Sequence, residues 1–222
     1  MKFIDLFCGA GGLSKGFEMQ GFECIAAIDS SKACIDTHKL NFPNCVSICS
    51  DISKVDPKKL KKSLKTEINL IVGGPPCPTF STIGHAKIMS VNKKDSDFKI
   101  LNDERNFLFK KFFDFVKVLK PDYFVMENVP TFITKHKGII FDETLQIIDN
   151  LGYEILNLDS LVFNAADYGV PQLRKRMIMI GSRKNKIIFK PPRPSFFDPA
   201  KDTLKKYKEK KKYVTVKDAI SD

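Results

Sequence analysis

The chain has 222 residues and a formal net charge of +11, and 43% of its residues are hydrophobic. This length and hydrophobic content are enough for one good-sized core, so we expect a single globular body. The sequence has no apolar run long enough to cross a membrane and no basic-then-apolar signal at its start, whereas its basic character suits a partner that carries phosphate groups.

Short apolar runs and helical patterns alternate along the chain. Strands are predicted near residues 2–7, 23–28, 45–49, 68–72, 122–127, 154–162 and 176–182. Helices are predicted near residues 13–20, 31–40, 57–64, 105–119 and 140–151. Such alternation is typical of an α/β protein with a mostly parallel sheet and helices on both faces. We assign residues 1–200 to this domain and the lysine-rich residues 201–222 to a linker.

The first predicted strand runs into a glycine-rich turn, Phe7–Leu13, and then into a helical pattern. Glycines at the start of a helix let backbone N–H groups approach a ligand closely, although such a turn can also serve only to pack a strand on a helix. Ser14 stands where a dinucleotide fingerprint has its third glycine, which disfavours a nicotinamide or flavin cofactor.

Cys77 is the candidate nucleophile. It follows a predicted buried strand and the turn Gly73–Pro76, and ligands of open α/β sheets bind at the carboxyl ends of strands. Two prolines stiffen the turn. The long polar segment 78–102 that follows is typical of a functional lid or of a disordered loop. Without the other motifs, a loop cysteine with no role would be the better interpretation.

The other cysteines are Cys8, Cys24, Cys34, Cys45 and Cys49. Cys45 and Cys49 are the closest pair, and no second Cys/His pair at zinc spacing follows them. We therefore expect reduced thiols, no metal and a cytosolic protein.

Two later segments place polar groups at the edge of the sheet where Cys77 is expected. Glu127 ends an apolar strand and would supply an acid beside the nucleophile, although a salt-bridged or helix-capping Glu is the alternative. Arg174 and Arg176 are two residues apart at the start of a strand, so they point to the same face. That face could hold a carbonyl oxygen or a phosphate, or it could be a solvated strand end.

These segments, taken in order, resemble the cytosine-C5 DNA methyltransferase family. The matching pieces are Phe7–Gly12, Pro75–Cys77, Asp103–Phe109, Glu127–Val129 and Gln172–Arg176. The resemblance spans essentially the whole chain and covers the N-terminal, catalytic portion of the family. One departure is Pro78, where the family usually has Gln, and it bears on closure of the loop because proline removes a backbone donor.

The resemblance implies a Rossmann-like, S-adenosylmethionine-dependent methyltransferase fold with one antiparallel strand. The implied reaction transfers a methyl group to C5 of a cytosine flipped out of double-stranded DNA, through a covalent bond to Cys77, in a prokaryotic restriction–modification system. Glu127 would act at N3 of the base and Arg174 would hold O2. Arg176 would support the loop or a phosphate.

The resemblance also implies the contacts to S-adenosylmethionine. Phe7 would pack on the adenine, the glycine turn would receive the amino-acid end, and Asp29 and Asp51 would bind the ribose and the adenine amino group. Either aspartate could instead be a helix cap. The full implied set is Phe7, Gly9, Ala10, Gly11, Gly12, Leu13, Asp29, Ser30, Asp51, Ile52 and Pro76.

Two other interpretations stay open at this point. Relatives with the same motifs methylate cytosine in tRNA, and the sequence offers no discriminator. In the second, the chain is an inactive remnant or a subunit that needs a second chain, because the family's target-recognition region would follow Asp222. From this we expect the chain alone to be inactive on duplex DNA and to bind S-adenosylmethionine weakly, with Lys205–Lys212 near the junction to a partner.

Overall fold

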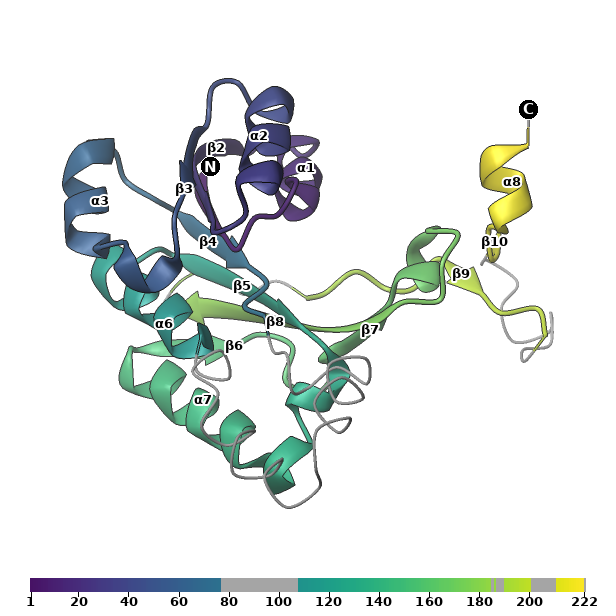
Figure 1. The fold of residues 1–222 in the computed structure, drawn as a ribbon. Coiled ribbons are helices and arrows are strands. Elements are labelled where there is room, and N and C mark those ends of the chain that lie inside the picture. The colour runs from purple at the N-terminus through teal and green to yellow at the C-terminus, as the bar shows by residue number, and fades with distance from the viewer. Residues whose placement is uncertain (77–107, 185, 187–189, 201–210, 222) are drawn as a thin grey trace, which may run out of the picture.

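The computed structural model describes residues 1–76, 108–184, 186, 190–200 and 211–221 (Figure 1). Its centre is one twisted sheet of eight strands, in which seven follow the order β3-β2-β1-β4-β5-β8-β6 and β7 pairs with β8. The strands are β1 (Lys2–Leu6), β2 (Glu23–Asp29), β3 (Val46–Cys49), β4 (Leu70–Gly73), β5 (Tyr123–Asn128), β6 (Tyr153–Ile155), β7 (Val162–Asn164) and β8 (Lys175–Arg183).

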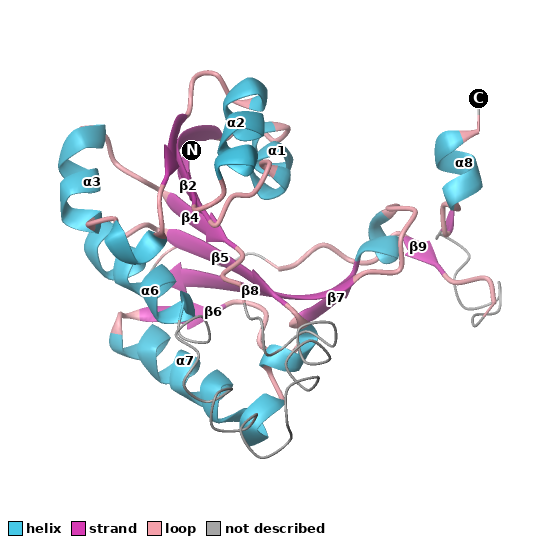
Figure 2. Ribbon diagram, in the orientation of Figure 1, coloured by secondary structure: helices cyan, strands magenta, loops and turns pink. Residues whose placement is uncertain are grey.

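Helices cover both faces of this sheet (Figure 2). On one face lie α1 (Gly12–Glu18) and α2 (Lys32–Asn41), and on the other lie α3 (Pro57–Leu64), α6 (Leu108–Leu119) and α7 (Ile139–Asn150). Short 3-10 helices connect them: η1 (Ile52–Lys54), η3 (Pro130–Phe132), η4 (Lys135–Gly138) and η5 (Ala165–Tyr168). The predicted α/β fold with helices on both faces is confirmed.

Successive side chains of β1 point to opposite faces of the sheet, so they are buried in both layers of the core. Ile4 and Leu6 are fully buried with the residues of α3, α6 and α7, whereas Phe3 packs with β4 and α1. Phe124 of β5 lies over β8 at Gly181, where a Cβ would come within 2.0 Å of its Cε1 atom. Only glycine therefore allows the ring to cover that strand, and this close approach lets β8 join the sheet.

The strand directions match the implied topology. β1 to β5 pair in parallel, and β8 runs antiparallel to β5, β6 and β7. β8 is thus the antiparallel strand that the resemblance implies. Because of its reversed direction, the amino end of β8 lies beside the carboxyl ends of the parallel strands.

The single strand predicted over residues 154–162 is wrong, since the chain forms β6 and β7 there with a turn between them. Asn157 explains the interruption. Its buried side chain donates to the carbonyls of Ser160 and Ile178, at 3.1 and 2.8 Å, and accepts from the Ile180 N–H at 3.0 Å. A side-chain amide thus takes over hydrogen bonds that a continuous strand would make through its backbone.

The last described segments lie away from the sheet (Figure 1). They are β9 (Phe196–Phe197), β10 (Lys211–Lys212) and α8 (Val216–Ile220), and β9 pairs with β10 in parallel. Thr215 and Asp218 form a reciprocal cap at the start of α8. The boundary between residues 200 and 201 stays a prediction. None of the helices in the described ranges is long and apolar enough to cross a membrane.

Candidate active site

The expected site residues meet at one edge of the sheet. Leu6 pairs with Gly73, Gly73 with Met126, and Glu127 with Ile178 of the reversed strand β8. The carboxyl ends of the five parallel strands and the amino end of β8 therefore share this edge. This is where ligands of open α/β sheets bind.

Glu127 lies beside the turn that leads to Cys77. A Cβ on Gly74 would be 3.1 Å from Oε2 of Glu127, so the carboxylate nearly touches that turn. Asn128 donates from Nδ2 to the carbonyl of Pro75 at 3.1 Å and ties the turn to β5. Cys77 itself lies outside the described residues. The expected proximity of acid and nucleophile is consistent with the position of Gly74 and Pro75.

An ion pair joins Glu127 to Arg176 at 2.9 Å between Oε1 and Nε. Each side chain is 27% exposed, so neither is fully desolvated. Arg176 thus orients the carboxylate, a contact that differs from the loop or phosphate contact expected from the resemblance. The pair combines a carboxylate and a guanidinium at the mouth of one pocket.

That pocket has a volume of about 320 Å³ and is lined by Glu127, Arg174 and Arg176. Its remaining walls are Phe163, Ala165, Tyr168, Ile178, Ile180, Pro191 and Pro192. The two arginines share one face, as their spacing predicts. Apolar walls with a few convergent polar groups suit a flat ring whose edge carries hydrogen-bonding atoms.

Hydrogen bonds from distant residues support Arg174. Asn164 accepts from the Arg174 N–H at 3.1 Å and donates from Nδ2 to the hydroxyl of Tyr213 at 3.2 Å. Tyr213 donates in turn to Asp167, whose carbonyl accepts from the Ser195 N–H at 3.0 Å. Burial and the contact with Asp167 raise the pKa of Tyr213 to about 12. No sequence motif pointed to this support, since its members are ordinary polar residues far apart in the chain.

The glycine-rich turn has the geometry that its composition predicts. Gly11 has φ of 98°, and a Cβ there would lie 2.3 Å from Cε2 of Phe42, so both conformation and space require glycine. Phe7 also has a positive φ of 63°. A Cβ added at Gly9 or Gly12 would meet nothing within 4 Å, so open space borders the turn.

Asp29 organises this turn. Its Oδ2 accepts from the Gly9 N–H at 2.9 Å, and its Oδ1 accepts from the Ser31 N–H at 2.8 Å. The structure thus joins two of the expected cofactor residues directly. A ribose contact by Asp29 stays a prediction.

The other expected cofactor residues are spread more widely. Asp51 caps η1 by accepting from the Ser53 N–H and hydroxyl, at 2.8 and 2.7 Å, and these hydrogen bonds lower the pKa of Asp51. The side chains of Leu13 and Ile52 pack into the core. The side chains of Ala10, Ser30 and Pro76 are exposed.

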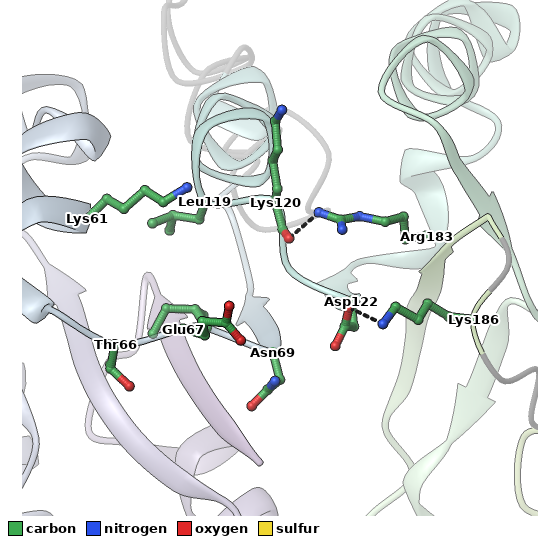
Figure 3. Close-up of a pocket in the computed structure, with 10 residues that line it drawn as sticks. Lys61, Thr66, Glu67, Asn69, Leu119, Lys120, Asp122, Arg183 and Lys186 are labelled. Atoms are coloured by element: carbon green, nitrogen blue, oxygen red, sulfur yellow. Dashed lines mark hydrogen bonds and ion pairs between the residues drawn. The ribbon is translucent and has the colours of Figure 1, made fainter.

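A second pocket, of about 410 Å³, lies at the opposite edge of the sheet (Figure 3). Three of the cations that line it have partners in the structure. Lys61 donates to the Val118 carbonyl at 3.1 Å, Arg183 donates to the Lys120 carbonyl, and Lys186 pairs with Asp122 at 3.0 Å. These contacts join the helices to the strands around the pocket. Because these cations are engaged in them, this pocket is a poor candidate for the functional site.

Comparisons with known proteins give the family of the chain. The family model described as C-5 cytosine-specific DNA methylase matches residues 1–222. The Type II methyltransferase M.XorII of Xanthomonas oryzae pv. oryzae is 38% identical and is matched over 99% of this chain and 45% of its own length. M.AquIA of Picosynechococcus is 36% identical, over 99% of this chain and 88% of its own length.

Solved structures give the same fold. A prophage-encoded E. coli protein described as a DNA modification methyltransferase has a TM-score of 0.73 and 30% identity, covering 99% of this chain and 54% of its own. The Dnmt2 methyltransferase of S. pombe shares the fold with a TM-score of 0.63 and 18% identity, over 85% of this chain and 53% of its own. The chain spans about half the length of most curated relatives that it matches.

Proposed function

Because the chain belongs to the C-5 cytosine-specific DNA methylase family, we propose that it methylates C5 of cytosine in double-stranded DNA for a restriction–modification system. The observation that carries the proposal is the Glu127–Arg176 pair beside the turn before Cys77. Relatives named as Type II methyltransferases favour DNA over tRNA as the substrate.

The chemistry follows from the weakness of cytosine C5 as a nucleophile. The Cys77 thiolate adds to C6, so electron density moves to C5 and makes it reactive. Glu127 hydrogen-bonds or protonates N3 as the ring accepts these electrons, and Arg176 holds the carboxylate in place. Arg174, which lines the same pocket, binds O2. After methylation, C5 loses its proton and Cys77 leaves C6, which restores the aromatic ring.

The open space beside Gly9 and Gly12 leaves room at the turn for S-adenosylmethionine, which would supply an electrophilic methyl group. The turn, with Asp29 behind it, would hold the amino-acid end through backbone N–H groups, and Phe7 would pack on the adenine. The target base must leave the DNA stack because neither of its faces is accessible to a thiol there. The prokaryotic cytosol is the compartment that this proposal implies, and a second chain that completes the enzyme stays a prediction.

The experiment is covalent trapping on DNA that contains 5-fluorocytosine. Fluorine at C5 cannot leave as a proton, so elimination of Cys77 stalls after methyl transfer. We expect a protein–DNA adduct that forms only with S-adenosylmethionine and maps to Cys77 by mass spectrometry. The chain is assayed alone and with any complementing chain, on duplexes of varied sequence.

Two variants make the trapping experiment specific. Cys77→Ala should abolish the adduct, whereas Cys49→Ala, which removes an exposed thiol at the end of β3, should leave it unchanged. An adduct that persists in Cys77→Ala would refute the assignment of the nucleophile.

A further inference from the structure

Three metal-binding side chains gather on the face of the sheet that α1 and α2 cover. Cys24 lies in β2, His38 in α2, and Cys45 just before β3. One potential ligand atom from each residue lies within 4.8 Å of the other two. His38 is fully buried and both cysteines are half-buried, so the cluster is inside the fold but close to its surface. None of the three takes part in the proposed methyl transfer.

The hydrogen bonds of His38 assign a role to each ring nitrogen. Nδ1 lies 2.9 Å from the hydroxyl of Ser47, and Nε2 lies 3.3 Å from the hydroxyl of Ser14. Metal-bound histidines usually donate from one nitrogen to an oxygen and ligate with the other. Ser47 therefore suits the outer partner of Nδ1–H. Nε2, on the side of Ser14, is then the nitrogen left to ligate a metal.

The surroundings of Ser14 extend this arrangement. The Ser14 hydroxyl donates its hydrogen to Oδ2 of the buried Asp5 at 2.6 Å. The lone pairs of the Ser14 oxygen are therefore available to another partner. The other carboxylate oxygen of Asp5, Oδ1, has no hydrogen-bond partner among the described residues. A buried carboxyl group with incomplete hydrogen bonding therefore lies beside the cluster, which is costly without a further partner.

We propose that Cys24, His38 and Cys45 bind one Zn²⁺ ion in a structural site, with the Ser14 oxygen in the fourth position. Two sulfurs and one imidazole nitrogen are ligands that zinc prefers, and four-coordinate tetrahedral geometry is its usual structural form. On binding, each thiol releases its proton to solvent. The two thiolates neutralise the ion, so the buried unit carries no net charge.

The position of the site gives it a structural consequence. The ring of His38 stacks on Phe42 with centroids 4.5 Å apart, and a Cβ on Gly11 would be 3.1 Å from the His38 ring. A metal that fixes His38 to β2 and to the start of β3 would therefore also fix the wall against which the glycine-rich turn packs. Bound zinc should raise the melting temperature of the domain.

The test is metal binding by the full chain, reduced and stripped of metal with a chelator. Titration with Co²⁺ should produce absorption from thiolate ligands that saturates near one ion per chain, and Zn²⁺ should displace the Co²⁺. Cys24→Ser and Cys45→Ser should each weaken Zn²⁺ binding by more than about a hundredfold, since even outer partners of a ligand are worth about 10- to 100-fold. Saturating Zn²⁺ should raise the melting temperature of the wild type but of neither variant.

Matched variants separate this proposal from a folding defect and from the proposed function. Cys49→Ser and Cys77→Ser should bind Zn²⁺ like the wild type, so a catalytically dead protein still tests the site. Ser47→Ala leaves every ligand in place and should weaken binding by about tenfold. Circular dichroism checks that each variant is folded. Unchanged Zn²⁺ affinity in both Cys24→Ser and Cys45→Ser, no stoichiometric binding by the reduced wild type, or a Cys24–Cys45 disulfide in place of binding would overturn the proposal.

Discussion

The two edges of the central sheet use charged side chains in different ways. At the edge opposite the candidate site, Lys61 and Arg183 donate to the backbone carbonyls of Val118 and Lys120. Figure 3 shows the contact of Arg183 and the ion pair between Lys186 and Asp122. Lys61 and Arg183 thus satisfy carbonyls at the end of α6, as cations near a helix C-terminus commonly do. At the carboxyl edge, Arg174 and Arg176 line one pocket together with Glu127, and Arg176 pairs with that acid.

The difference separates the pocket at the amino edge from the candidate functional pocket at the carboxyl edge. The pocket at the amino edge is the larger of the two, about 410 Å³ against about 320 Å³. Two of its cations, Lys61 and Arg183, nevertheless donate to backbone carbonyls beside it. In the smaller pocket, a carboxylate and two guanidinium groups converge between apolar walls. The arrangement of polar groups, and not the volume, distinguishes the candidate site.

The largest difference between the two edges is expected in the rate of methyl transfer when the acid at each edge, Glu127 or Asp122, is replaced by its amide. Glu127→Gln keeps the size and hydrogen bonding of the side chain but removes its proton chemistry, so methyl transfer should slow by roughly a hundredfold or more. Asp122→Asn at the other edge breaks the ion pair with Lys186 and should change the rate by less than about twofold. Single-turnover methylation and DNA binding are measured together, in the smallest preparation that is active. Collapse of DNA affinity with an unaltered rate would show that Glu127 is a DNA contact.

A smaller, reciprocal effect is expected for the arginines. Arg176→Lys keeps the charge but loses the planar guanidinium that holds Glu127, so kcat should fall by about tenfold with little change in stability. Arg183→Lys loses the hydrogen bond to the Lys120 carbonyl, so the free energy of unfolding should fall by about 1 kcal/mol with little change in kcat. Kinetics and urea unfolding of both variants test this comparison. The same pattern of losses in both would remove the distinction between the edges.

The smallest effect is expected at Tyr213, which supports the functional pocket from outside. Tyr213→Phe removes the hydroxyl that joins Asp167 and Asn164, so the free energy of unfolding should fall by about 1 kcal/mol. The raised pKa of Tyr213, about 12, means that the native state keeps its proton more tightly than the unfolded chain. Its contribution is therefore complete below pH 10 and is lost as the pH rises toward 12. Urea unfolding from pH 8 to pH 11 should show a steeper alkaline loss for the wild type than for Tyr213→Phe.

Most of the fold was predictable because periodic apolar patterns and glycine or proline boundaries report local structure directly. The strands that end at Leu6, Asp29, Cys49, Gly73 and Asn128 all lie within two residues of their predicted positions. The turn at Asn157 was not predictable, since it depends on a side chain that hydrogen-bonds to a strand distant in the sequence.

The candidate site was predictable to a smaller extent. Motif order and strand ends brought Glu127, Arg174 and Arg176 to one pocket, as expected. The sequence could not predict that Arg176 pairs with Glu127, or that Asn164 and Tyr213 support Arg174, because these contacts form only after β8 and the last segments join the body. The cluster of Cys24, His38 and Cys45 was missed because its three members have no short, recognisable spacing in the sequence.

The reversed strand β8 also has a consequence for folding during synthesis. The parallel strands β1 to β5 leave the ribosome before β8, and β8 is the strand that pairs with β5, β6 and β7. Glu127 is therefore translated well before Arg176, and β5 has an open edge during that interval. Such edges are prone to pair with other chains. Insertion of β8 brings Arg176 to Glu127 and closes that edge in the same event, so the candidate site and the protection from aggregation form together.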